Sequence, residues 1–194
     1  TSLTHLDSAM GGNLSGAHWN PDTRTLWVVC NGPARFWAVV EDGSGGWKVD
    51  TKGGQRAEYD VGGDTEGITQ ADPNEDVVYI VDEPAFIRAY DVSTGRSPVL
   101  QTSWNILSYL PFSFGGGLGP EGLTFVPDAA LSAAGFVDGN GQLRTSQNGM
   151  GGLMFVVHQD GGNLYVFDLD RTNGSYDFVG QYITSHGESS GLEF

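Results

Sequence analysis

The chain has 194 residues, of which 39% are apolar and 11% aromatic, which excludes a disordered segment and suffices for one domain with a sizeable core. Nine basic residues stand against 24 acidic ones, and the net charge of −15 argues against a nucleic-acid partner because it repels phosphates. A single cysteine excludes an internal disulfide, and no apolar run approaches the ~20 residues needed for a membrane span.

The first predicted unit covers residues 13–63. Its strand runs are LSGAHW, TLWVVC, RFWAVV and WKVD, separated by the turn sequences NPDTR, NGPA and EDGSGG. These runs are short, rich in Val, Phe and Trp, and bounded by Gly, Pro, Asn and Asp, as is typical of β-strands. Cys30 ends the second run, so we expect a buried, inert thiol.

Two further units follow the same order, over residues 64–118 and 119–186. The second contains EGITQ, VVYIVD and FIRAYDV, and the third contains EGLTFV, LMFVVHQ, NLYVFDL and YDFVGQYI. No segment sustains a helical apolar stripe, so helices should be few and short. Two insertions interrupt the pattern, at 103–119 and at 128–152. Long insertions in a repeat architecture either carry binding function or are passive decoration.

A glycine-led motif opens each unit. It reads NLSGAHWNPD, DTEGITQADP and GPEGLTFVPD, and it returns in the last residues as GESSGLEF. The motif aligns four glycines at intervals of roughly 50–70 residues, namely Gly16, Gly67, Gly122 and Gly191. A β-sandwich also uses short strands between turns, but it has no reason to repeat one motif in this way. The pattern predicts an all-β protein, a β-propeller of four-stranded blades.

About three and a half blades fit within the sequence, because residues 187–194 match only the first strand of another blade. Propellers usually close with about four to eight blades. We therefore expect a fragment of a larger propeller, or an open arc whose edge is completed by further blades or by a partner chain. The alternative is a small propeller whose two terminal segments share strands.

The longer stretches LSGAHWNPDTRTLWVVCNGPARFWAVV, DTEGITQADPNEDVVYIVDEPAFIRAYDV and PEGLTFVPD with LMFVVHQDGGNLYVFDL resemble the SdiA-regulated family of β-propellers. That family is related to the phytase-like and esterase-like-phytase propellers. The successive S-G, E-G, E-G and S-G openings carry the resemblance over nearly the whole chain. The resemblance implies about six blades and a calcium site, and it implies little about activity. The two insertions depart from the family pattern.

The innermost strands of a propeller line a central channel, and the loops at one mouth form the usual ligand site. Equivalent positions of successive blades converge on that axis. The motif openings and the loops after each second strand therefore supply the candidate channel residues, which are Ser15, Asn31, Glu66, Asp82, Glu83, Glu121, His158, Gln159, Asp160 and Ser190.

Carboxylates gathered on one axis repel one another unless a cation or protons intervene. Ca²⁺ takes oxygen ligands from carboxylates, carbonyls and water, so the candidate metal set is Glu66, Asp82, Glu83 and Glu121. The alternative is structural: Glu66 and Glu121 accept backbone hydrogen bonds and fasten blade to blade. A second stretch, DGNG at 138–141, matches only the start of a calcium loop, and a turn is the favoured interpretation.

The favoured function is an extracellular or cell-surface binding or assembly module, stabilised by a divalent cation. Its acidity and two glycosylation sequons, at Asn13 and Asn173, point this way. Zinc-site spacings, a nucleophile elbow and a phosphate-binding loop are all missing from the sequence, so enzyme activity is left open and not favoured.

The alternative function is a calcium-dependent, phytase-like phosphoester hydrolase. It would need basic side chains to bind phosphate, and only Arg35, Arg88 and Arg144 lie near suitable loops. Several Lys or Arg side chains at the same mouth as the acids would favour this function.

Overall fold

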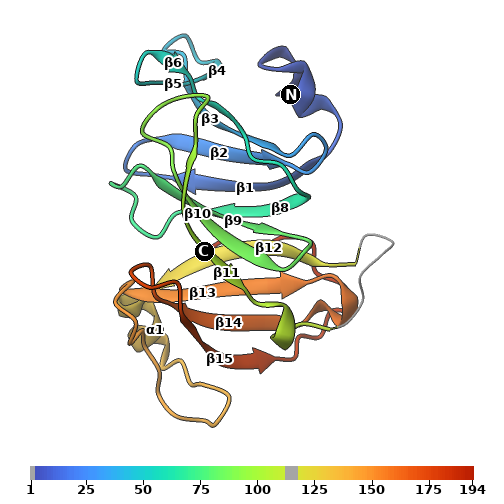
Figure 1. Ribbon diagram of the computed structural model, residues 1–194, viewed down its shortest axis with the longest axis vertical. Helices are drawn as coiled ribbons and strands as arrows, with labels where there is room; N and C mark the ends of the chain where they lie inside the picture. The colour runs from blue at the N-terminus through green and yellow to red at the C-terminus, as the bar shows by residue number, and fades with distance from the viewer. Residues whose placement is uncertain (1–2, 112–117) are drawn as a thin grey trace.

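The computed structural model describes residues 3–111 and 118–194, and in these residues three larger antiparallel sheets are stacked side by side, with a separate small two-stranded sheet (Figure 1). The predicted insertion at 103–119 therefore lies partly outside the described residues. Each of the three larger sheets corresponds to one predicted unit and is called a blade below.

The strands of each blade pair in chain order. The first blade contains β1 (Leu14–Asn20), β2 (Thr25–Cys30), β3 (Arg35–Glu41) and β4 (Trp47–Val49). The second contains β8 (Thr65–Thr69), β9 (Val77–Asp82), β10 (Phe86–Asp91) and β11 (Val99–Asn105). The third contains β12 (Pro120–Pro127), β13 (Gly152–His158), β14 (Leu164–Leu169) and β15 (Tyr176–Tyr182).

Smaller elements connect or cover the blades. They are η1 (Leu3–His5), η2 (Ser8–Gly11), β5 (Thr51–Lys52), β6 (Gln55–Arg56), β7 (Glu58–Asp60), η3 (Leu107–Tyr109), α1 (Asp128–Ala134) and η4 (Asp160–Gly162). The sequence pattern did not predict β7, which pairs with the first half of β3 while β4 pairs with the second half. It also missed β11, whose residues are mostly exposed and whose polar sequence carries one buried anchor, Trp104.

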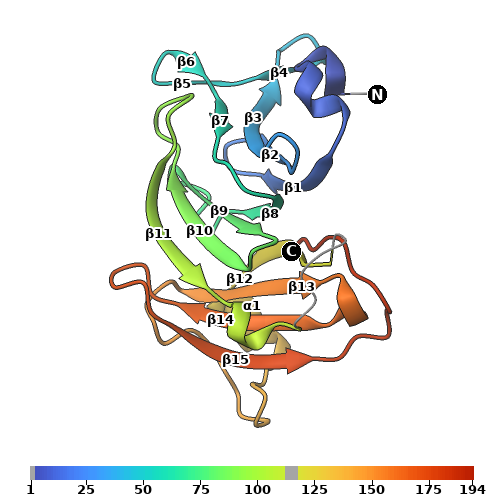
Figure 2. The ribbon, with the colours of Figure 1, turned by 45° about the vertical axis from the view of Figure 1, so that its right-hand side comes forward.

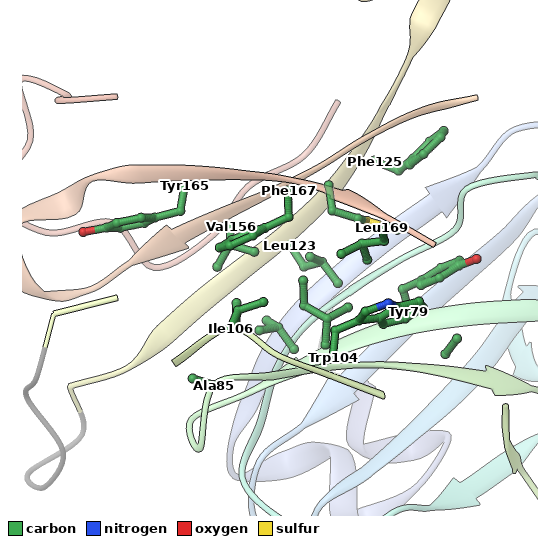
Figure 3. Close-up of a cluster of buried hydrophobic side chains, with 14 of the residues drawn as sticks. Tyr79, Ala85, Trp104, Ile106, Leu123, Phe125, Val156, Tyr165, Phe167 and Leu169 are labelled. Carbon is green, nitrogen blue, oxygen red and sulfur yellow. The ribbon is translucent and has the colours of Figure 1, made fainter. Parts of the chain in front are cut away.

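The central strands bury both of their faces, because side chains alternate across a strand. All residues of β9 are buried. Tyr79 and Val81 face a core shared with the third blade, whereas Val78 and Ile80 face a core shared with the first. Figure 3 shows the former core, where Tyr79 and Trp104 of the second blade meet Phe167 of the third.

The motif glycines let the inner strands β1, β8 and β12 approach one another closely. A Cβ on Gly16 would lie 2.6 Å from the carbonyl oxygen of Glu66, and one on Gly67 would lie 2.5 Å from the amide nitrogen of Leu123. A Cβ on Gly122 would lie 2.8 Å from the amide nitrogen of Leu192. Residues 191–192 therefore lie beside β12 as β12 lies beside β8. The repeated glycine is a close-approach position between blades.

Segments outside the repeat cover the far faces of the first and third blades. The side chains of Met10 and Ala9 pack against Cys30 and Trp37 of the first blade. Leu131 of α1 and Phe136 pack against the far face of the third blade, with α1 lying beside β13 in Figure 1. The helix ends at Gly135, which has φ 65° and ψ 39° and lets the Phe136 amide donate to the Leu131 carbonyl.

Candidate functional site

The candidate site lies where the inner strands begin and the second strands end. Antiparallel pairing sets Thr65 opposite Asp82, and the Glu83 amide donates to the Asp64 carbonyl at 2.9 Å. The residues that flank Thr65 and Asp82 along the chain therefore lie together at one end of the second blade. Figure 2 shows β1, β8 and β12 side by side in the middle of the molecule, where three blades contribute to this end.

Three carboxylates of the second blade meet there. One oxygen from each of Asp64, Glu66 and Glu83 lies within 4.8 Å of the others. Glu66 is only 3% exposed, and burial raises its pKa, with the charge of Asp64 adding to the effect. Burial also raises the pKa of Glu83, followed by the charge of Asp64. Like charges in a partly buried site disfavour ionisation, so the cluster carries an electrostatic cost when it is ionised.

Glu121 of the third blade lies close enough to these carboxylates to be affected by their charges. Burial, then the charges of Glu66 and Glu83, raise its pKa to about 7. The charges of Asp64 and Glu188 contribute in the same direction. A carboxyl group that titrates near neutrality is sensitive to a bound cation, because an opposite charge nearby favours the ionised form.

Side chains of the first blade bound the cluster. The amide nitrogen of Asn31 donates to Glu66 Oε1 at 3.1 Å, whereas Asn31 Oδ1 is buried and has no hydrogen-bond donor. Ser15 also bonds to Glu66, which opposes the effect of burial on its pKa. An unpaired buried oxygen is costly, and here it lies on a side chain that contacts Glu66, the most buried carboxylate of the cluster.

Asp82 and His158 are engaged away from the cluster. Asp82 is 1% exposed, forms an ion pair with Arg88, and accepts the Phe86 amide at 2.9 Å within its own hairpin. His158 is 2% exposed, and its Nδ1 accepts the Asp160 amide at 3.1 Å. Burial lowers the His158 pKa, which favours the neutral ring that the acceptor role of Nδ1 requires.

The remaining predicted channel residues differ in exposure. Ser190 and Asp160 are exposed, and Gln159 is half-buried with its side-chain nitrogen 3.0 Å from Glu188 Oε1. Asp64 and Glu188 are not among the residues predicted from the motif. Asp64 precedes Glu66 by two residues in DTEG, and the two-residue period of a strand was the available signal. Glu188 carries no comparable strand signal.

An axial pocket of about 310 Å³ adjoins the cluster. Its walls are the glycine-led stretches of the three inner strands and the segment beside β12. Glu121 lines this pocket, together with Ser15 and Glu193. A ligand in the pocket would therefore contact the carboxyl group whose pKa is near 7.

Seven of the nine basic residues form ion pairs with carboxylates outside the Asp64, Glu66 and Glu83 cluster. Arg35 pairs with Glu58 and Asp60, and Arg144 pairs with the buried Asp168. The other ion-paired cations are Arg24, Lys52, Arg56, Arg88 and Arg171. The side-chain charges that shift the pKa values of Glu66, Glu83 and Glu121 are all carboxylates.

Other candidate positions behave as turns or surface groups. Asp138 Oδ1 accepts the amides of Asn140 and Gln142, which closes a turn. Asn13 and Asn173 are exposed, and Cys30 is buried. Among residues 3–111 and 118–194, no helix is long and apolar enough to span a bilayer.

No family model matches the sequence, and no curated protein does. Among solved structures, the periplasmic gluconolactonase PpgL of Pseudomonas aeruginosa is similar over 94% of this chain and 44% of its own, with 14% identity and a TM-score of 0.53. The chain has the β-propeller fold. At this identity the likeness shows the fold alone, and the chain spans less than half of that structure.

Two other solved structures are similar at lower scores. A protein from Lactobacillus plantarum has 11% identity and a TM-score of 0.48, over 92% of this chain and 45% of its own. The β-propeller domain of Nup133 from Vanderwaltozyma polyspora has 12% identity and a TM-score of 0.41, over 82% of this chain and 43% of its own.

Proposed function

We propose that the protein is a β-propeller binding module whose inner-strand mouth holds a divalent cation, with Ca²⁺ as the favoured ion. The observation that carries the proposal is the convergence of Asp64, Glu66 and Glu83 within 4.8 Å. The near-neutral pKa of Glu121 beside them is the electrostatic consequence of gathering these acids. A bound cation would offset the repulsion between the carboxylates and stabilise their ionised forms.

The donor chemistry favours a hard cation. Ca²⁺ accepts carboxylate and amide oxygens in a flexible geometry, and the site offers three carboxylates and the unpaired Oδ1 of Asn31. Mg²⁺ retains more water and requires a stricter octahedron. The nitrogen and sulfur ligands that transition metals prefer are engaged or distant, since His158 accepts a backbone amide and Cys30 is buried beside Ala9.

The phosphoester hydrolase alternative receives less support. Phosphate recognition relies on Arg and Lys side chains that are free to form bidentate contacts. Arg35, Arg88 and Arg144 each pair with a carboxylate of their own blade. The mouth therefore presents an acidic field, which repels a phosphate ester unless bound cations invert it. We favour a non-enzymatic module.

We also propose that a further blade docks beside Gly191. Gly16, Gly67 and Gly122 each abut the backbone of the next inner segment, whereas a Cβ on Gly191 meets no described atom within 4 Å. A partner chain could supply that strand instead. Intact mass of the native protein separates the two sources, because further blades in the same chain require a mass well above 20.7 kDa.

We also propose that the protein is secreted or displayed at the cell surface. Both sequons lie at exposed positions, which is compatible with glycosylation on a cell surface. The SdiA-regulated and phytase-like propellers remain the family relation that we propose from the successive glycine motifs.

Melting in the presence of calcium tests the cation site. At pH 8, a hundredfold excess over the dissociation constant should raise the melting temperature by about 5–10 °C, because only the folded state binds. Asp64→Asn should lose most of this shift. The matched control, Asp22→Asn, removes an exposed carboxylate in the turn at the opposite end of β1 and should retain it. An unchanged melting temperature in calcium would leave the carboxylates as structural fasteners and end the proposal.

A further inference from the structure

The two insertions meet at the outer edge of the third blade. A pocket of about 390 Å³ is lined by Tyr109 from the first insertion, by Asp138, Asn140 and Arg144 from the second, and by Asp177, Phe178 and Val179 of β15. Its size lies within the range of small-ligand sites, roughly 300–1,000 Å³. The pocket is not part of the blade repeat. Apart from β15, its lining comes from the two insertions, which interrupt the repeat.

One wall is a fixed aromatic ring. Tyr109 is 42% exposed, yet its ring stacks on Phe178 with centroids 4.4 Å apart. Phe167 and Tyr176 hold it with edge contacts at 6.1 and 6.0 Å. A ring held by three others loses little conformational freedom when a ligand covers it.

The rest of the lining includes planar polar groups. Asp138 Oδ1 accepts two amides of its own turn, which fixes the direction of its carboxylate. The Asp177 side chain is 61% exposed. Arg144 donates to the buried Asp168 at 2.9 Å, so its charge is compensated while its guanidinium stays fixed at the pocket. The backbone bond from Gly139 to the Val179 carbonyl, at 2.9 Å, holds this turn against β15.

We propose that this pocket binds a pyranose ring of a neutral saccharide. An aromatic face matches the C–H face of a sugar ring, and neighbouring carboxylate, amide and guanidinium groups supply acceptors and donors for adjacent hydroxyl groups. An anionic ligand would need an uncompensated cation, but Arg144 is neutralised by Asp168. A purely apolar ligand would leave the polar wall unpaired. This site is separate from the acidic mouth and does not depend on the proposed cation.

Saturation-transfer NMR tests the proposal with the methyl glycosides of glucose, galactose, mannose and N-acetylglucosamine. At least one of them should receive saturation on its ring protons. Tyr109→Ala should weaken its binding by about tenfold, and Asp177→Asn, at an exposed position, should weaken it by about threefold. Tyr109→Phe keeps the ring and should bind within about twofold of the wild type.

Trp47→Ala provides the matched control, because Trp47 is another partly exposed aromatic residue and lies on the first blade. It should leave binding unchanged. The proposal is overturned if none of the four glycosides receives saturation from the folded wild-type protein. Equal binding by wild type and Asp177→Asn, together with equal losses in Tyr109→Ala and Trp47→Ala, would also overturn it.

Discussion

The two ends of the inner strands both carry buried polar side chains, but of opposite character. At the far ends of β1 and β8, the side chains are neutral and paired: Asn20 donates to Gln70 Oε1 at 2.7 Å, and Trp27 donates to the same oxygen at 2.8 Å. Gln70 in turn donates to the Glu75 carbonyl at 3.1 Å. At the near ends, Glu66 lies with like-charged Asp64.

The difference separates a structural network from the proposed cation site. A satisfied neutral network joins blades at little electrostatic cost and needs no ligand. Ionised carboxylates that face one another disfavour the folded state, and Asn31 Oδ1 beside them has no donor. The acidic end therefore has the properties expected where a fold accommodates a binding function at some cost in stability.

Breaking the contact between blades should give the largest effect. Gly67→Ala places a Cβ 2.5 Å from the Leu123 backbone, which cannot move aside as a flexible side chain can. We expect a loss of about 3 kcal/mol or more in the free energy of unfolding, measured by urea denaturation. Gly191→Ala, the same motif with no described atom within 4 Å, is the control and should cost little in this chain. Equal losses in the two variants would contradict the glycine argument.

Removing hydrogen bonds at the neutral end of the inner strands should give the next largest loss of stability. Gln70→Ala removes the acceptor of both Asn20 and Trp27 at a position that is 7% exposed. We expect a loss of about 2–3 kcal/mol, because the Trp27 indole N–H and one amide N–H of Asn20 are left unpaired, while the other Asn20 N–H keeps the Pro73 carbonyl. Calcium affinity should stay unchanged, since Gln70 lies at the opposite end of β8. A variant that is as stable as the wild type would show that the network is dispensable.

Removing a charge at the acidic end should instead raise the free energy of unfolding. Glu66→Gln keeps an acceptor for Asn31 and removes one like charge. Without calcium at pH 8, the variant should be more stable by about 0.5–1 kcal/mol, and its calcium response should be lost. If the variant is destabilised and still responds to calcium, Glu66 is a blade-to-blade fastener and the comparison of the two ends fails.

The pH dependence should be the smallest effect. The pKa of Glu121 is raised from 4.5 to about 7 in the folded protein. The contribution of this group to the free energy of unfolding is therefore fully present below about pH 4.5. That contribution is lost as the pH rises through about 7, because Glu121 in the folded protein then ionises despite repulsion from the neighbouring carboxylates. Calcium-free melting curves should show this decline, and Glu121→Gln should flatten it. A decline of equal size in the variant would assign the titration to another group.

The sequence predicted the repeat better than it predicted the chemistry. The four motif glycines follow from one steric need, so their spacing located the inner strands and brought Ser15, Glu66 and Glu121 to one mouth. Asp82 is predicted in one set with Glu83, but Asp82 is the last residue of β9 and pairs with Arg88 of the neighbouring strand, whereas Glu83 lies in the turn that follows. The site at Tyr109 depends on how two insertions fold against β15, which no local pattern specifies.

Calorimetric titration of the protein with calcium tests the central claim most directly. We predict one site that disappears in Glu66→Gln and persists in Asp22→Asn. At pH 7 binding should release a fraction of a proton, because a nearby cation lowers the Glu121 pKa from about 7. The observed enthalpy would then depend on the ionisation enthalpy of the buffer. Absence of binding heat and of proton release in every buffer would contradict a cation site at the mouth of this propeller.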